Sequence, residues 1–169
     1  GYLPLRRFAK SEIVPSNKDR FLRKETLQGF VHDEASAFFG GLAGNAGLFS
    51  TARDVARVYQ MLLNGGEIDG QRYLSKETCQ LFTTETSKIS RRGLGFDKPD
   101  ADDPKKGNCA PAAPAEVYGH TGFTGTCAWV DPVNELVYVF FSNRIYPDVT
   151  NRKLNQLHIR ERIQGAIYD

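Results

Sequence analysis

The sequence predicts an α+β fold in which helices flank an antiparallel sheet. Three β-rich runs, 116–121, 126–132 and 135–143, follow one another with only a glycine turn and a short polar link between them. That succession is typical of an antiparallel meander. Apolar residues recur at helical spacing before these runs, in 51–64, and after them, in 151–169. We therefore expect helices packed on an antiparallel sheet.

Length and charge indicate one globular unit, 1–169, without a polyanionic partner. A chain of 169 residues with 40% hydrophobic content can bury one core of ordinary size. Its 22 basic and 20 acidic side chains give a net charge of +2, too weak a field to gather nucleic acid or an anionic membrane surface. No apolar run approaches the ~20 residues that span a bilayer. We expect no nucleic-acid partner.

The number and spacing of the cysteines predict neither disulfide bonds nor a metal site. Cys79, Cys109 and Cys127 are odd in number and widely spaced. Neither a disulfide scaffold nor a metal cluster has that pattern. We expect buried or idle thiols.

The first half of the chain divides into an irregular segment and a helical one. Residues 1–35 are polar and keep no period of 2 or 3.6, which predicts loop with short turns. Residues 36–90 are predicted to be helical. This segment includes a glycine-dense stretch, 40–47, where one backbone segment can approach another closely.

Two helices have end signals in this segment. Ser50 or Thr51 can cap the first, and Gly65 and Gly66 can end it. Ser75 can cap a second, short helix over 75–83.

The second half changes character. Residues 91–150 are predicted to form antiparallel strands, beginning with a short candidate strand at 93–96. The segment 97–116 is rich in Pro, Ala, Asp and Lys and predicts a long loop, of a length more typical of a lid or mobile insertion than of a connector. Leu136 to Phe141 is almost continuously apolar, so we expect cover on both faces of that strand. The C-terminal helix, 151–169, can supply one cover.

Three features have plainer explanations than a ligand site. The glycine cluster lacks the spacing of a phosphate loop and favours close packing. The basic residues of the last helix share it with acidic ones and lack interleaved aromatics, which favours a solvated face. The isolated histidines have no second ligand at metal-binding spacing. The basic residues are Arg152, Lys153, Arg160 and Arg162, and the isolated histidines are His32 and His158. We expect no metal and no cofactor.

His120 is the candidate site. It ends a predicted strand, Thr121 and Gly122 follow, and the chain then turns back into the sheet. An imidazole, a hydroxyl and an open backbone N–H would meet a bound group at the sheet edge. The alternative is a β-turn that happens to contain a histidine.

Three stretches resemble one family. "HTG" at 120–122, with "GLAGNAGLFSTARDVARVYQMLLNGG" upstream and "VYVFFSNRIYP" downstream, looks like the C-terminal half of the serine β-lactamase and penicillin-binding-protein-like family, in particular its class C-like and esterase-like members. The similarity runs from about residue 38 to the end. In that family a nucleophilic serine lies in S-x-x-K, Tyr-x-Asn or Ser-x-Asn adds acid–base groups, and a K-T-G strand forms the opposite wall. Here His120 stands in place of the lysine.

The resemblance implies a role for each matching residue. His120 would line the site and supply a proton donor or positive potential, and Thr121 would hydrogen-bond a substrate carboxylate or carbonyl. Gly122 would keep the strand edge clear, and the Phe123 N–H would be one of two oxyanion-hole donors. Asn143 would lie near the substrate carboxylate, where Arg144 adds charge.

The nucleophile is the missing part. No serine has a lysine three residues later, and no tyrosine or serine has an asparagine two residues later. The resemblance therefore implies a C-terminal part of a β-lactamase/transpeptidase-like fold, without the family's N-terminal strands. We expect this chain alone to be inactive, and its open sheet edge to favour self-association, which light scattering would reveal.

The histidine also bears on the substrate. Histidine at this position is typical of relatives that act as D-amino-acid peptidases or esterases, so the resemblance ranks a D-amino-acid peptide or ester above a β-lactam as substrate of the parent protein. It also implies a periplasmic or cell-surface location. The alternative is a non-catalytic binding or interaction module that retains the cleft.

Overall fold

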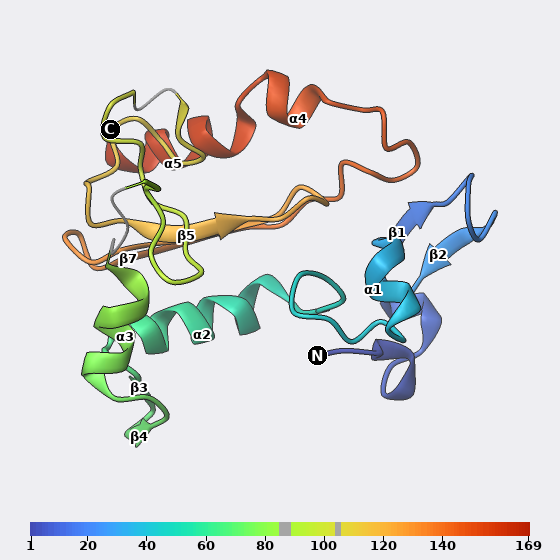
Figure 1. The fold of residues 1–169 in the computed structure, drawn as a ribbon, viewed down its shortest axis with the longest axis horizontal. Helices are drawn as coiled ribbons and strands as arrows, with labels where there is room; N and C mark the ends of the chain where they lie inside the picture. Colours follow the sequence, from blue (N-terminus) through green and yellow to red (C-terminus); the bar gives the residue numbers. More distant parts are fainter. Residues whose placement is uncertain (85–88, 104–105) are drawn as a thin grey trace. The chain divides into compact units, whose positions relative to one another are not determined.

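The computed structural model describes residues 1–84, 89–103 and 106–169. The chain divides into two compact units. One comprises 1–51 and 142–153, and the other comprises 52–141 and 154–169 (Figure 1). The expectation of a single domain stays a prediction.

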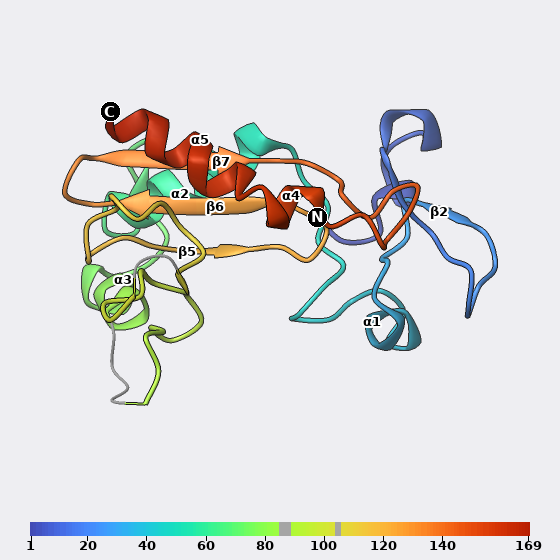
Figure 2. The ribbon, with the colours of Figure 1, turned by 90° about the horizontal axis from the view of Figure 1, so that it is seen from above.

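The larger unit contains the predicted meander. Strands β5 (Tyr118–Thr121), β6 (Cys127–Asp131) and β7 (Leu136–Phe140) form an antiparallel sheet in the order β5-β6-β7. Figure 2 shows the three strands side by side. In the register, His120 pairs with Ala128 and Trp129 pairs with Tyr138. The sequence prediction of this sheet is confirmed, because short β-rich runs joined by tight links have few other ways to pair.

Helices cover both faces of this sheet. Helix α2 (Ala52–Leu63) packs against β6 and β7, and α5 (Ile159–Tyr168) lies on the opposite side (Figure 1). The hydroxyl of Tyr138 donates to the Arg160 carbonyl at 3.1 Å, which ties α5 to β7. A core of buried side chains lies in this unit: Cys109, Val117, Cys127, Trp129 and Tyr138.

The fully buried strand is β6 rather than β7. Every residue of β6 is buried, whereas most of β7 is half-buried and Phe141 is exposed. The continuous apolar run from Leu136 to Phe141 predicted cover on both faces of β7, and this cover is less complete than expected. The reason is position, since β7 lies at the edge of the three-stranded sheet and helices cover an edge strand less completely.

Several predicted helix boundaries agree with the structure. Helix α2 starts directly after Thr51, and its end has Gly65 and Gly66 at φ 67° and 95°, with the Gly66 N–H donating to the Met61 carbonyl. Helix α3 (Lys76–Thr83) is capped by Ser75, whose hydroxyl accepts from the Thr78 N–H at 3.1 Å.

The segments predicted as helical, 36–90 and 151–169, are less uniform than expected. A hairpin of β3 (Glu67–Ile68) and β4 (Gln71–Arg72) interrupts the first, and its residues 85–88 lie outside the described ranges. The second consists of α4 (Lys153–Gln156) and α5, separated where His158 adopts φ 48°. A left-handed residue cannot continue an α-helix.

The candidate strand at 93–96 is wrong. Gly95 has φ 104°, and the Gly93 N–H donates to the Phe96 carbonyl at 3.0 Å, so this segment turns back on itself. Only Asp97, just beyond it, forms an isolated bridge to β5, at Gly119. In the described part of the predicted loop 97–116, turns and bends predominate, with the bridge at Asp97 and a 3-10 conformation at Lys106.

The smaller unit is more ordered than its sequence pattern suggests. It contains the 3-10 turns η1 (Pro4–Arg6) and η2 (Lys10–Glu12), an antiparallel pair of β1 (Pro15–Lys18) and β2 (Thr26–Gln28), and helix α1 (Glu34–Phe38). The prediction of irregular structure for 1–35 therefore needs correction. Strands this short leave no readable alternation.

A buried carboxylate closes the loop between β1 and β2. Asp19 accepts from the N–H groups of Phe21 and Leu22 and from Arg23 Nε, the last at 2.7 Å. The Arg23 side chain, opposed by burial and aided by the backbone N–H groups, lowers the pKa of Asp19 to about 2. Arg23 also donates to the carbonyls of Val31 and His32. Polar contacts, rather than an apolar pattern, thus organise this segment.

Candidate functional site

The H-T-G segment lies at the end of β5 in the larger unit. His120 is exposed, and Thr121 and Gly122 are half-buried. One side of β5 pairs with β6, and the other receives the Asp97 bridge at Gly119. The sheet therefore holds the backbone of His120 and Thr121 while the imidazole remains in contact with solvent.

Both ring nitrogens of His120 have partners. Nδ1 lies 2.7 Å from the Thr121 carbonyl oxygen, and Nε2 lies 2.7 Å from a terminal nitrogen of Arg92. A carbonyl oxygen can only accept a hydrogen bond and a guanidinium can only donate one. Nδ1 therefore carries the proton and Nε2 is the acceptor, which is the neutral Nδ1–H tautomer.

Sequence reasoning missed Arg92. It lies 28 residues before His120 in the chain, directly before the turn at 93–96 for which the sequence predicts a strand. The doublet of Arg91 and Arg92 before a glycine-rich turn was the available signal, but no local pattern links it to β5.

A buried carboxylate anchors this turn. Asp97 is 0% exposed and accepts from Arg91 through both oxygens, at 2.8 and 3.1 Å, and from Asn108 at 2.7 Å. Burial alone would raise the pKa of Asp97, but the hydrogen bonds from Arg91 and Asn108 and the nearby guanidinium charge outweigh it, so its pKa lies below the ordinary value. Asp97 is therefore an anion that fixes Arg91 beside β5.

Two glycines allow the close approach of β5 and its neighbours. A Cβ on Gly119 would lie 2.1 Å from the Ala128 carbonyl oxygen and 2.6 Å from the Trp129 ring. A Cβ on Gly122 would lie 2.2 Å from the Thr126 hydroxyl. The glycine of the H-T-G segment is thus required by packing within the turn.

The replacement Gly122→Ala should lower the free energy of unfolding by about 1 to 2 kcal/mol, because the Thr126 hydroxyl must leave its rotamer to admit the new methyl group. The second change Thr126→Ala removes that hydroxyl and should restore most of the loss. Urea unfolding of the two single variants and the double variant measures this. If the loss in the double variant equals the sum of the losses in the two single variants, no such clash exists.

Phe123 follows the H-T-G segment directly and is 59% exposed. The role of its N–H as an oxyanion-hole donor stays a prediction. The Gly122 N–H, by contrast, is used within the turn, since it donates to the Thr126 carbonyl at 2.7 Å.

Asn143 and Arg144 belong to the smaller unit, so the structure does not join them to His120 in one described site. The Asn143 amide nitrogen donates to the carbonyls of Pro15 and Ser16, at 2.5 and 3.2 Å, while its oxygen is buried without a partner. Arg144 is half-buried near His32, whose pKa is lowered by burial, with Arg144 among the cations that add to the effect. The substrate-binding role of both residues stays a prediction.

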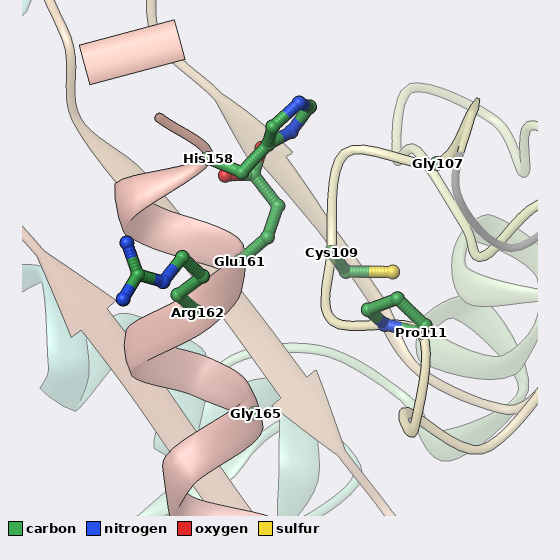
Figure 3. Close-up of a pocket in the computed structure, with 7 residues that line it drawn as sticks. All are labelled: Gly107, Cys109, Pro111, His158, Glu161, Arg162 and Gly165. Carbon is green, nitrogen blue, oxygen red and sulfur yellow. The ribbon is translucent and has the colours of Figure 1, made fainter. Parts of the chain in front are cut away.

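A hollow of about 350 Å³ lies elsewhere in the larger unit, between α5 and the loop 107–111. Figure 3 shows Cys109 and Pro111 on the loop and Glu161 on the facing helix, whereas the Arg162 side chain extends away from the loop. None of the six predicted site residues lines this hollow.

The three cysteines are free and buried. Burial raises the pKa of all three thiols, to about 12 for Cys109 and about 11 for Cys127. At neutral pH they are protonated and poor nucleophiles, which agrees with idle thiols. Across 1–84, 89–103 and 106–169, no three His, Cys, Asp or Glu side chains gather as a metal site would require. In the same ranges no helix has both the length and the apolar character needed to cross a bilayer.

Comparison with known proteins shows a family match over most of the chain. The profile of the Beta-lactamase family matches residues 7–161. The chain belongs to the Beta-lactamase family. Its mixture of helices with an antiparallel sheet agrees with part of a β-lactamase/transpeptidase-like fold, as the resemblance of the H-T-G and flanking segments predicted.

Two similar proteins share one name. The chain is 34% identical over 161 residues to a protein of Escherichia coli (strain K12) named "Putative D-alanyl-D-alanine carboxypeptidase", with 92% of this chain and 37% of that protein covered. A protein of the same name from Salmonella agona (strain SL483) is 36% identical over 135 residues, covering 79% of this chain and 31% of that protein. The chain thus spans about a third of the length of these relatives.

Proposed function

We propose that this chain forms one wall of the active site of a serine hydrolase that removes a C-terminal D-amino acid from a peptide. The observation that carries the proposal is the exposed His120 near the end of β5. The resemblance to the family implies that His120 stands in place of the lysine of β-lactamases. The two relatives described above are named "Putative D-alanyl-D-alanine carboxypeptidase", which supports a peptide over a β-lactam as the substrate. Hydrolysis of an ester or of a β-lactam would proceed by the same type of acyl transfer.

In this proposal the wall binds and polarises the substrate. The Thr121 hydroxyl and the His120–Arg92 pair hold the part of the peptide beyond the scissile bond, and the Phe123 N–H donates to the oxyanion that forms on the carbonyl. The attacking serine and its lysine come from an S-x-x-K that these 169 residues do not contain. Acid–base groups of a Tyr-x-Asn, likewise absent from this sequence, complete the site.

The experiment is release of D-alanine by the full-length protein from a peptide that ends in D-alanyl-D-alanine. We expect turnover that is lost when the S-x-x-K serine is replaced by alanine, and slower hydrolysis of a chromogenic cephalosporin. The same peptide ending in L-alanyl-L-alanine is the control. Turnover that survives the serine replacement would refute acyl transfer through that serine.

A second candidate is a binding module without catalysis, which the absence of S-x-x-K from this sequence favours. In that case calorimetry would detect binding of the D-alanyl-D-alanine peptide to the full-length protein, with no D-alanine released. Release of D-alanine excludes this candidate.

A further inference from the structure

Arg160 is a buried cation, although the sequence predicted a solvated position for it. It is 7% exposed, whereas Arg152, Lys153 and Arg162 of the same C-terminal segment are exposed. Across the described parts of the chain, no carboxylate lies within ion-pair distance of its guanidinium. Removing a cation from water without a counter-charge is costly. The burial of Arg160 therefore needs an explanation beyond packing.

The Arg160 guanidinium reaches the turn that follows the H-T-G segment. Its Nη1 donates to the Thr126 carbonyl at 3.3 Å, and its Nη2 donates to the side-chain oxygen of Asn155 at 3.2 Å. Its Nε is buried and has no partner among the described residues. The same Thr126 carbonyl accepts from the Gly122 N–H at 2.7 Å. One carbonyl oxygen therefore joins α5 to the glycine of the H-T-G segment.

The turn between β5 and β6 closes around Phe123. In addition to the bond from Gly122 to Thr126, the Gly125 N–H donates to the Gly122 carbonyl at 3.0 Å. Phe123 lies inside this turn, directly after Gly122. A shift of the Thr126 carbonyl would therefore move the backbone of Phe123, whose N–H the proposed function uses as an oxyanion donor.

The part of α5 that carries Arg160 is itself fixed to its surroundings. The Tyr138 hydroxyl donates to the Arg160 carbonyl at 3.1 Å, and Tyr138 belongs to the buried core of the larger unit. One turn further along α5, the side-chain oxygen of Gln164, a residue that is 1% exposed, accepts from the Ala110 N–H at 2.9 Å. The guanidinium is thus presented to Thr126 by a rigid helix segment, as precise positioning requires.

The charge of Arg160 is felt at the end of the turn. Burial raises the pKa of the Cys127 thiol to about 11, the Arg160 charge acts against this rise, and Glu161 contributes more weakly in the same direction as burial. Cys127 directly follows Thr126. Glu161 is therefore near, but one of its carboxylate oxygens is buried without a partner among the described residues, so it does not neutralise Arg160 by direct contact.

We propose that Arg160 is a positioning residue of the active site, whose guanidinium holds the Thr126 carbonyl and thereby the turn that presents Phe123. This inference rests on the proposed function and adds to it a residue that touches neither the substrate nor the reacting atoms. A hydrogen bond from a cation is stronger than one from a neutral donor. The turn can then keep one geometry while negative charge forms on the substrate oxygen.

The first test measures amide hydrogen exchange by mass spectrometry in the full-length protein. In Arg160→Met, which keeps the stem but not the donors, the peptide spanning 119–127 should exchange about 10-fold faster, because the Gly122 amide opens more often. Arg160→Lys keeps a charged donor and should lie between Met and wild type. Arg162→Met is the matched control, since Arg162 is exposed and extends away from the loop 107–111 (Figure 3). It should leave the exchange unchanged.

Exchange in α2 separates a local effect from a global one. An apolar replacement of a buried charge is often neutral or stabilising, so Arg160→Met should remain folded and α2 should exchange as in the wild type. Unchanged exchange of 119–127 in Arg160→Met overturns the inference. An equal rise in α2 and in 119–127 also overturns it, because Arg160 would then stabilise the whole fold rather than the turn.

The second test separates this inference from the proposed function. With the D-alanyl-D-alanine peptide and the full-length protein, Arg160→Met should lower kcat about 10- to 100-fold and change KM less than about 3-fold, because a displaced oxyanion donor affects the transition state more than substrate binding. Arg160→Lys should recover part of kcat, and Arg162→Met should match the wild type. An unchanged kcat, or a loss confined to KM, overturns the inference. If the wild type releases no D-alanine, the proposed function fails, and the exchange measurement still decides whether Arg160 holds the turn.

Discussion

Residues 1–169 on their own should hydrolyse neither a chromogenic β-lactam nor an activated ester faster than buffer does. Acyl transfer in the Beta-lactamase family needs an activated serine, and this sequence contains no S-x-x-K. Removing the nucleophile of a serine hydrolase costs about 10⁶-fold in kcat. In the proposed site the second oxyanion donor would be the N–H of that serine residue, and its absence should cost a further ~3 kcal/mol.

The hydroxyls of this chain cannot take over the reaction. Thr121 lies in β5 with the neutral His120 beside it, but the Nε2 of His120 already accepts from Arg92 and its Nδ1 carries a proton. No free base is therefore available at the ring. The full-length protein, measured at the same concentration, is the positive control. Hydrolysis by residues 1–169 that disappears in Thr121→Val would mean that a nucleophile lies within this chain.

Replacement of Asp97 should have the largest effect on stability. In Asp97→Asn, Arg91 loses the carboxylate that accepts its two short hydrogen bonds and keeps the more distant Asp100, at 3.7 Å. The amide of Asn108 then faces a second amide at a position with 0% exposure. Breaking a buried pair by removing one partner costs about 3–5 kcal/mol, a large share of the 5–15 kcal/mol that typically stabilises a domain. Denaturant unfolding measures the loss.

Asp100→Asn is the matched control. Asp100 lies 3.7 Å from the same Arg91 guanidinium, but its side chain is 23% exposed and the contact is longer. We expect a loss below about 1 kcal/mol. Comparable losses in the two variants would show that Asp97 stabilises the fold no more than the partly exposed Asp100 does.

The pH dependence of the Asp97→Asn effect has a defined sign. The folded-state pKa of Asp97 lies below its ordinary value, so its contribution is fully present above about pH 4 and is lost as the pH falls through the folded-state pKa. The difference in unfolding free energy between wild type and Asp97→Asn should shrink between pH 5 and the acid limit. Other carboxylates affect both proteins alike and cancel in the difference. A difference that grows on acidification would contradict a lowered pKa.

The parts of the fold that follow from local pattern were predictable from sequence. Alternating and β-rich runs gave the order of β5, β6 and β7, and the cap at Ser75 and the glycines at 65 and 66 gave helix ends. These features depend on residues within a few positions of one another, so a single sequence contains them.

The parts that depend on distant contacts were not predictable. The turn at 93–96 looks like a strand until the Gly119 bridge beyond it is known, and Arg92 reaches His120 across 28 positions. The β1–β2 pair is closed by the polar contacts of Asp19 and Arg23, which leave no hydrophobic period. The H-T-G segment was found by resemblance, because a histidine at a strand end has no distinctive local signal of its own.

The most direct measurement locates the acyl group. The full-length protein is incubated with a penicillin, digested, and analysed by mass spectrometry for the peptide that carries the added mass. If residues 1–169 form only the facing wall, the adduct maps to the serine of an S-x-x-K outside them, and residues 1–169 alone keep their unmodified mass. An adduct on any residue between 1 and 169, abolished by Thr121→Val or His120→Ala, would contradict this division of the site.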